Sequence, residues 1–179
     1  ILNSADYGVP QVRKRVIFIG SRVTKTILFP DISHTVHLTV KDALSKLPKL
    51  KSGEESTLLN HKAMNHTQQM LEKMSYLKDG EGREKIPQNL RPKSGDVRKY
   101  IKYDSTKPSI TITGDMRKVF HPTQNRALSV RELARIQTFP DDFEFKSTSI
   151  AQQQQVGNAV PPLMAEAIAG AIIKMIDAQ

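Results

Sequence analysis

The segment 161–177 constrains the fold of this chain more than any other part of it. Its apolar residues recur every three or four positions and extend around most of a helix. The thin polar stripe that remains consists of Glu166, Gly170, Lys174 and Asp177. Such a helix requires burial on most sides, yet the chain has few other long apolar elements and only 38% apolar residues, a low content for a globular domain. We therefore expect the helix to pack against a domain outside the sequence, and the chain to be a fragment.

The sequence contains no cysteine. This excludes disulfides, thiolate metal sites and a cysteine nucleophile supplied by this chain. The apolar stretch 160–176 carries Glu166 and Lys174 and is too short to span a bilayer comfortably, so we expect no membrane association. The first residues do not resemble a signal peptide, and we expect the biological start to lie before Ile1.

Basic residues concentrate in one part of the chain. Residues 83–118 contain ten Lys or Arg and four Asp or Glu, so one fifth of the chain carries two thirds of its net charge of +9. Phosphate backbones attract such a segment because each neutralised phosphate releases condensed counterions. Nucleic acid is the expected partner; the alternative is a solvated loop that is basic only for solubility.

Several short elements are predicted along the chain. Residues 16–19 are a β-branched and aromatic run closed by a glycine, which predicts a buried strand. Helical spacing predicts a short helix over 39–47 and a second around 67–77, and alternation predicts a half-buried strand over 109–113. The sequence Ser-Val-Arg-Glu at 129–132 has the spacing of a capping box, which predicts the start of a further helix.

Three separated blocks of sequence resemble motifs of the DNA cytosine-C5 methyltransferases. In the first block, Gln11, Arg13 and Arg15 alternate ahead of the apolar run, like the Gln-x-Arg-x-Arg motif of that family. The second contains Arg-Ile-Gln-Thr-Phe-Pro and is similar to the penultimate motif, and the third contains Gln-Val-Gly-Asn-Ala-Val-Pro-Pro and is similar to the final Gly-Asn-x-Val motif. The three blocks span residues 6–20, 126–143 and 155–162.

The resemblance implies an α/β fragment. It would comprise a small mixed α+β target-recognition domain, plus a strand and a C-terminal helix that belong to a Rossmann-like S-adenosylmethionine-dependent methyltransferase domain. Residues 1–20 would end the catalytic domain, 21–150 would form the target-recognition domain with the penultimate motif at 126–145, and 151–179 would return to the catalytic domain. The family's Gly-rich cofactor loop, Pro-Cys nucleophile motif and Glu-Asn-Val motif would lie before Ile1.

The activity implied by the resemblance is methyl transfer from S-adenosylmethionine to C5 of a cytosine flipped out of a specific double-stranded DNA sequence. Family members of this kind belong to bacterial restriction-modification systems, which implies a cytoplasmic protein that acts on nucleoid DNA. A cysteine thiolate adds to C6 and makes C5 nucleophilic. Because this chain has no cysteine, we expect it to be inactive alone and to need a missing N-terminal catalytic half, in the same or a second chain.

The first block would supply the catalytic side chains. By resemblance, Arg15 would direct its guanidinium to O2 of the flipped cytosine and stabilise the charge that develops during thiolate attack, with Arg13 and Gln11 in support. Without the other blocks, these three alternating residues would be interpreted as ordinary solvated residues at a strand edge.

The third block would contribute to the site of S-adenosylmethionine, the one cofactor expected. By resemblance, Gly157, Asn158 and Ala159 would contact the amino-acid end of the cofactor. Many relatives carry a hydroxyl residue where Ala159 stands, so the resemblance supports a backbone contact there and leaves a side-chain contact open. The alternative for a Gly-Asn pair before a helix is a simple turn and cap.

The predicted DNA contacts come from the basic segment and from residues 107–113, which resemble the Thr-plus-aliphatic pair of recognition regions. Side chains between 60 and 120 would read base edges in the major groove while Lys and Arg bind phosphates. Two alternatives remain, a stand-alone non-enzymatic DNA-binding module and one chain of a split methyltransferase. The predicted contacts are Arg98, Lys99, Lys102, Lys107, Thr111, Ile112, Arg117 and Lys118.

No metal is expected in this chain. His34 and His37 are three residues apart, but neither a cysteine nor a carboxylate-rich helix accompanies them. In the second block, we expect Arg131, Glu132 and Arg135 to support the structure instead of taking part in the reaction.

Overall fold

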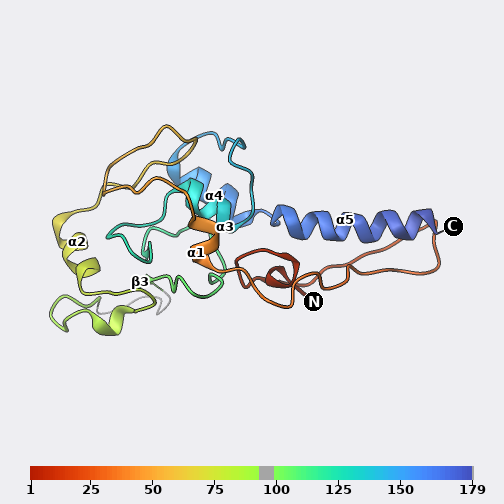
Figure 1. Cartoon of the computed structure of the whole chain (residues 1–179), viewed down its shortest axis with the longest axis horizontal. Coiled ribbons are helices and arrows are strands. Elements are labelled where there is room, and N and C mark those ends of the chain that lie inside the picture. The colour runs from red at the N-terminus through yellow and green to blue at the C-terminus, as the bar shows by residue number, and fades with distance from the viewer. Residues whose placement is uncertain (93–98, 179) are drawn as a thin grey trace.

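Helix α5 (Pro162–Asp177) extends from a lobe that contains helices α1 to α4, which gives the molecule an elongated shape (Figure 1). The computed structural model describes residues 1–92 and 99–178. The N-terminal residues and the segment that follows them run beside α5, and the middle of the chain forms the far end of the lobe. The predicted C-terminal helix is thus confirmed, with a start one residue later than expected.

The main core of the lobe lies between α1 (Val40–Leu44), α3 (Val130–Ile136) and α4 (Ser149–Asn158). Thr39 and Ser129 begin α1 and α3, and each forms a capping box with the acidic residue three positions later. Both predicted starts are therefore confirmed, although α1 ends earlier than the periodicity suggested. The core joins these helices through apolar side chains, among them Val40, Tyr103, Ile112, Leu128, Leu133, Ile136, Phe145 and Val156.

A second, smaller cluster holds the outer part of the lobe. Helix α2 (Gln68–Ser75), capped by the side chain of Thr67, contributes Met74 to this cluster. The 3-10 helix η2 (Arg83–Lys85) follows it, and the short strands β3 (Ile101–Lys102) and β4 (Val119–Phe120) pair in parallel beside it. The lobe is therefore a mixture of helices, two-residue strands and long connections, as the mixed α+β expectation required.

The N-terminal segment forms a small unit against α5. Strands β1 (Leu2–Asn3) and β2 (Lys14–Arg15) pair antiparallel around the 3-10 helix η1 (Ser4–Tyr7). Apolar contacts from this unit reach the first turns of α5, where Met164 is buried. The unit therefore packs the first block against the helix that follows the third block.

The predicted buried strand over 16–19 is wrong for the described chain. Strand β2 ends at Arg15, the residue that pairs with Leu2. Val16 and Phe18 are 58% and 92% exposed. The physical reason is pairing: β1 offers no partner beyond Leu2, so the apolar run has neither a ladder nor a neighbouring sheet to cover it.

The predicted strand over 109–113 is also absent as a regular element. Its backbone makes a single parallel bridge, between Ser109 and Gln11, and then leaves the ladder. Ile112 is fully buried whereas Ile110 is 39% exposed. The segment is extended because side chains of the first block hold it, as described below.

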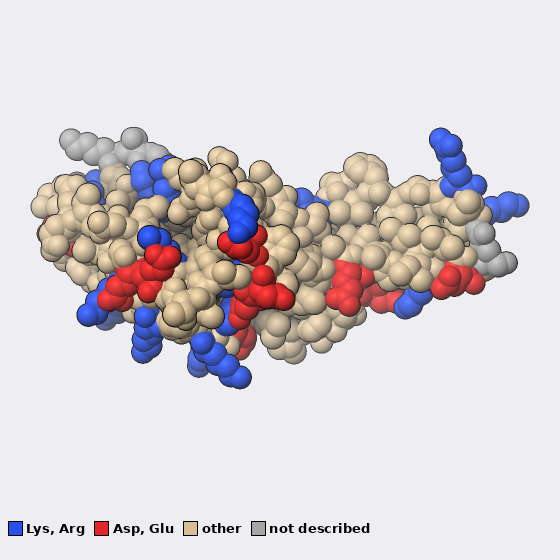
Figure 2. Space-filling model, turned by 90° about the horizontal axis from the view of Figure 1, so that it is seen from above, with Lys and Arg blue, Asp and Glu red and all other residues tan. Residues whose placement is uncertain are grey.

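Helices α4 and α5 together are long and apolar enough to cross a membrane by length and composition, with 22% of the most apolar window buried. A break at Ala159–Pro161 separates the two helices, which are 10 and 16 residues long, and a transmembrane helix needs about 20 apolar residues. Both helices pack on other parts of this chain. Figure 2 shows Lys and Arg side chains around the lobe with Asp and Glu between them. Along the arm the surface is largely uncharged in the middle, with acidic side chains along one edge and basic ones at the far end.

Candidate catalytic and DNA-binding site

The three sequence blocks meet in the interior. Gln11 of the first block is fully buried, and its Nε2 donates to Oε1 of Gln137 in the second block at 2.9 Å. Nε2 of Gln137 in turn donates to the carbonyl oxygen of Val156 in the third block at 2.8 Å. The interpretation of Gln11 as a solvated strand-edge residue is therefore wrong, because its amide is a buried link between motifs.

Arg13 makes a second connection between the blocks. It is 5% exposed, and its guanidinium donates to the carbonyl oxygens of Ile112 at 3.0 Å and Gly157 at 2.8 Å. Burial, with the nearby charge of Arg15, lowers the pKa of Arg13. A buried cation needs full hydrogen bonding to offset its desolvation, so Arg13 serves to fix two backbone segments to each other. Arg13 thus links the first block to the 109–113 segment and to the third block.

The third residue of the first motif, Arg15, lies at the surface. It is the last residue of β2, is exposed, and donates from Nη1 to the carbonyl oxygen of Lys14. Arg13 lies immediately before β2 and Arg15 is its last residue, so a buried guanidinium and an exposed one are two residues apart. The fold therefore holds the base of Arg15 in place and leaves its charged end free of any carboxylate among the described residues.

The third block forms the turn between α4 and α5. The exposed Asn158 ends α4, and its side chain makes no hydrogen bond to another described residue. The carbonyl of Gly157 accepts from Arg13, and the Ala159 N–H donates to the carbonyls of Gln155 and Val156. Of the three predicted cofactor residues, Asn158 thus offers a free polar group. The Ala159 N–H is engaged within the chain, and a backbone contact of Ala159 with the cofactor stays a prediction.

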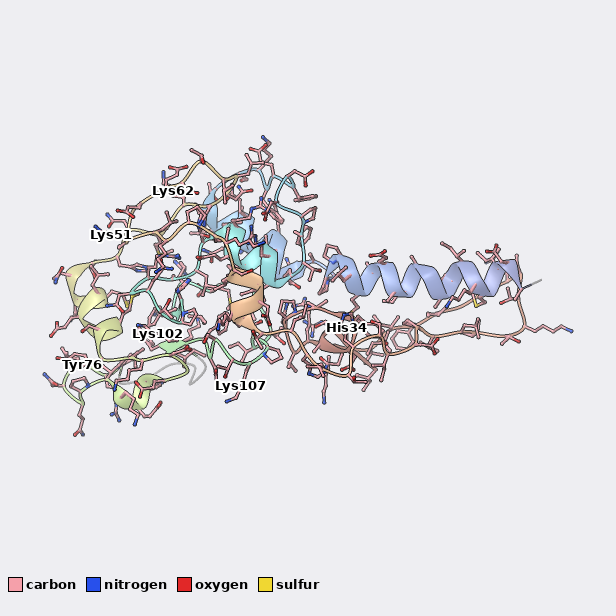
Figure 3. All side chains as sticks on the ribbon, in the orientation of Figure 1. His34, Lys51, Lys62, Tyr76, Lys102 and Lys107 are labelled. Atoms are coloured by element: carbon pink, nitrogen blue, oxygen red, sulfur yellow. The ribbon has the colours of Figure 1, made fainter. Side chains whose placement is uncertain are left out.

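Four of the predicted DNA contacts carry charge at the surface, and each has an intramolecular neighbour. Lys99 and Arg117 both bind Asp115, at 3.0 Å and 2.8 Å, and these contacts lower the pKa of the Asp115 carboxyl well below its usual range. Lys107 binds Asp104 at 2.7 Å and points away from the lobe (Figure 3). Exposed pairs of this kind are weak, so they leave the cations able to exchange onto phosphate. Lys118 lies 5.3 Å from the centre of the Tyr100 ring.

Two other predicted DNA contacts are buried, which corrects the expectation that they are exposed. Lys102 is 6% exposed, and its Nζ donates to Oδ1 of Asn125 at 2.8 Å inside the lobe (Figure 3). Ile112 is fully buried in the main core. Strand pairing of β3 with β4 turns Lys102 inward, and the contacts from the first block hold Ile112. Thr111 stays partly exposed and donates to the carbonyl of Val12.

Arg98 lies outside the described residues. The histidine pair does not converge, since His37 binds Asp6 and His34 contacts Ser33. Within residues 1–92 and 99–178, no three His, Asp or Glu side chains gather as a metal site would require.

The polar residues of the second block support the structure, as expected. Glu132 is 1% exposed and binds the guanidinium of the fully buried Arg126 through both carboxylate oxygens, at 2.6 and 2.7 Å. Arg131 is also fully buried and donates to the carbonyls of Leu59, Pro140 and Phe143. These contacts close the loop around α3 and hold the long middle segment against it.

Gln137 is the site residue that the sequence reasoning missed. It follows α3 directly and is fully buried. The available signal was an uncharged amide within an otherwise apolar Ile-Gln-Thr-Phe stretch, because a buried amide requires partners for both its donor and its acceptor.

The chain is similar to known proteins of one family. The family model of the C-5 cytosine-specific DNA methylases matches residues 1–174. The chain is 63% identical over 175 residues to the Type II methyltransferase M1.HphI of Haemophilus parahaemolyticus, with 98% of this chain and 47% of that protein covered. It is 32% identical to the Type II methyltransferase M.DdeI of Desulfomicrobium norvegicum, with 94% and 52% covered.

A solved structure has the same fold. A DNA modification methyltransferase encoded within an E. coli prophage matches with a TM-score of 0.69 at 21% identity, over 98% of this chain and 59% of that one. The chain spans about half the length of the curated relatives it matches. The family model matches nearly all of the chain, and this shows that the chain belongs to the C-5 cytosine-specific DNA methylase family.

Proposed function

We propose that this chain is the C-terminal part of a DNA cytosine-C5 methyltransferase, which supplies target recognition and part of the active and cofactor sites. The observation that carries the proposal is the convergence of the three blocks through Gln11, Gln137 and Arg13. The exposed Arg15 and the exposed Asn158 lie on two segments that this buried network of hydrogen bonds joins. A stand-alone binding module would not need such a buried network.

Arg15 acts on the flipped cytosine. Attack of a thiolate at C6 places negative charge on the ring and its O2, and a guanidinium held beside O2 stabilises that charge with a fixed pair of N–H donors. Because β2 and the buried Arg13 hold its backbone, only the side chain of Arg15 has to be ordered when it makes this contact. The nucleophilic cysteine comes from the N-terminal half.

Asn158 contributes to the cofactor site. S-adenosylmethionine supplies the electrophilic methyl group. The free amide of Asn158, at the exposed turn between α4 and α5, can both donate to a carboxylate and accept from an ammonium, which suits the amino-acid end of that cofactor. Gly157 and Ala159 use their backbone groups internally and determine where the Asn158 side chain stands.

DNA binding falls to the exposed cations of the lobe. Lys99, Lys107, Arg117 and Lys118 would exchange their intramolecular contacts for phosphates, while Thr111 and nearby side chains contact bases. In this proposal the lobe over 21–150 is the target-recognition domain, and residues 1–20 and 151–179 belong to the catalytic domain.

The missing half would cover the apolar surface of the arm. Phe18 is almost fully exposed, and Ile173 on α5 is 58% exposed. Exposed apolar residues of this size mark interaction surfaces when they occur together. An N-terminal catalytic domain of the same protein, or of a second chain, accounts for both of them.

The test is labelled methyl transfer from S-adenosylmethionine to mixed-sequence DNA, with this chain alone, the N-terminal half alone and the two together. We expect activity only in the mixture. A silent mixture, in which the N-terminal half is folded and this chain still binds DNA in a salt-sensitive manner, would overturn the proposal and support a non-enzymatic binding module.

A further inference from the structure

Five buried hydrogen bonds form a closed ring that passes through all three sequence blocks and the 109–113 segment. The Ile112 N–H donates to Oε1 of Gln11 at 3.0 Å, Nε2 of Gln11 donates to Gln137, and Gln137 donates to the Val156 carbonyl. Arg13 then donates to the carbonyls of Gly157 and Ile112, which closes the circuit. We call this set the buried amide ring; its members are Gln11, Arg13, Ile112, Gln137, Val156 and Gly157.

The ring has a fixed direction. Each glutamine accepts with Oε1 and donates with Nε2, so neither amide can rotate by 180° without facing a donor with a donor or an acceptor with an acceptor. Gln11 and Gln137 are both fully buried, so a reversed amide would leave polar groups unpaired in the interior, which is costly. The two side chains therefore fix each other's orientation and have a single low-energy arrangement.

Members of the ring are close in sequence to the two exposed polar groups of the proposed site. Arg15 is two residues beyond Arg13, and Asn158 is one residue beyond Gly157. The ring also holds both backbone groups of Ile112, and the partly exposed Thr111 precedes it. A shift at any member moves the segments that carry the catalytic arginine, the cofactor amide and a recognition residue relative to one another.

We propose that Gln137 is a positioning residue: through its paired amides it sets the distance between Arg15 and Asn158, and thereby aligns the target base with the methyl donor. This inference rests on the proposed function. Gln137 touches neither substrate nor cofactor in this scheme, and acts only through Gln11 and the Val156 carbonyl. Misplacing reacting groups by about 1 Å can reduce a rate about 100-fold.

The test uses Gln137→Met in the complete methyltransferase that carries this chain. Methionine has a similar length and volume but makes no comparable hydrogen bonds, so packing is kept while the ring opens. The matched control is Gln153→Met. Gln153 is also a buried glutamine, 5% exposed, and accepts from the Met116 N–H, but it lies outside the ring.

Four quantities are measured for each variant: kcat, the dissociation constant for S-adenosylmethionine by equilibrium binding, the dissociation constant for DNA, and the thermal midpoint. We expect Gln137→Met to lower kcat about 10- to 100-fold and to weaken cofactor binding, with DNA affinity changed less than about threefold. Gln153→Met should lower the thermal midpoint by no more than Gln137→Met does, because Gln153 accepts a single hydrogen bond of 3.4 Å, and it should leave kcat within about twofold. A purely structural role for Gln137 predicts equal kcat for the two variants, which would overturn the inference.

A double-mutant cycle with Gln11→Met makes the test specific to the ring. If the two amides act as a unit, the double variant should lose no more of kcat than the worse single variant. Additive losses would contradict the inference. Should Gln137→Met fail to fold, Arg13→Lys opens the ring elsewhere, since one ammonium cannot reproduce the two-pronged contact, and the same loss of kcat is expected.

The outcomes of the two proposals can be separated. If the parent enzyme does not methylate DNA, the proposed function is wrong. If the parent methylates DNA and Gln137→Met is as active as Gln153→Met, only the positioning role is wrong. Hydrogen exchange at the Ile112 amide gives an independent readout, because opening the ring at Gln137 frees Gln11 and should accelerate that exchange relative to the Gln153→Met control.

Discussion

The backbone of Gly157 lies against the backbone of Thr113 so closely that a side chain could not stand between them. A Cβ atom on Gly157 would be 2.5 Å from the carbonyl carbon of Thr113 and 2.8 Å from the nitrogen of Gly114. Both neighbours are backbone atoms, which cannot move aside as a flexible side chain can. The glycine of the third block is therefore required by the packing of α4 against the segment after Ile112.

Gly157→Ala should destabilise the protein by about 1 to 3 kcal/mol, because the added methyl group must displace backbone. Gly170→Ala on α5 is the matched control, since a Cβ there meets nothing within 4 Å. Alanine in a helix interior is more favourable than glycine by about 1 kcal/mol, so the control should be neutral or stabilising. Urea unfolding of the two variants and the parent measures this difference; equal stability of the two variants would contradict the close approach.

The stability of the lobe should fall as the pH decreases from about 6.5 to about 4. Burial lowers the pKa of His121 from its usual value near 6.5 to about 4, despite the opposing attraction of Glu132; Arg126, Lys102 and His61 also lower it. Because the folded pKa is below the unfolded one, the unfolded state takes up a proton first as the pH decreases. The free energy of unfolding should then decline by at most about 1.4 kcal/mol per pH unit across this window.

His121→Gln removes this titration and should flatten the decline between pH 6.5 and 4. The control is His66→Gln. Burial also lowers the pKa of His66, but that side chain is only half buried, so this change should flatten the decline less than His121→Gln does. Unfolding is followed by circular dichroism at each pH. If the His121→Gln protein loses stability as steeply as the parent, His121 is not the source of the pH dependence.

Local elements were predictable where their causes are local. Capping by Thr39, Thr67 and Ser129 depends on residues within one turn, and all three helices start as the sequence indicated. Burial was not predictable in the same way. The apolar run at 16–19 indicated a buried strand, but burial requires a partner that the described chain does not supply.

The same distinction between local features and burial applies to the candidate site. Motif spacing identified Gln11, Arg13 and Asn158, because those positions follow from the sequence alone. The partner of Gln11 is 126 residues away, and no local pattern indicates such a contact. The same limit explains why Lys102 was expected at the surface: its burial depends on the pairing of β3 with β4, which charge counting does not predict.

DNA binding should become less sensitive to salt when the exposed cations of the basic segment are neutralised. The triple change Lys107→Gln, Arg117→Gln and Lys118→Gln should reduce the slope of log K against log salt by up to about 0.9 for each phosphate that the variant no longer neutralises. The control neutralises three exposed lysines outside residues 60–120, namely Lys25, Lys146 and Lys174. Filter binding from low to moderate salt measures both slopes, and equal slopes for the two triple variants would remove these cations from the DNA-binding surface.

Arg15→Ala in the complete methyltransferase should reduce kcat about 100- to 1,000-fold, the usual loss when a donor to a developing anion is removed. DNA affinity should change by less than about threefold, because one phosphate-independent contact contributes little to the ground-state complex. The matched control is Lys14→Ala, which removes the neighbouring exposed cation of β2. Single-turnover methyl transfer separates chemistry from product release. An Arg15→Ala rate close to that of Lys14→Ala would show that the exposed guanidinium does not stabilise the transition state, even though the strand that carries it is anchored to the buried amide ring.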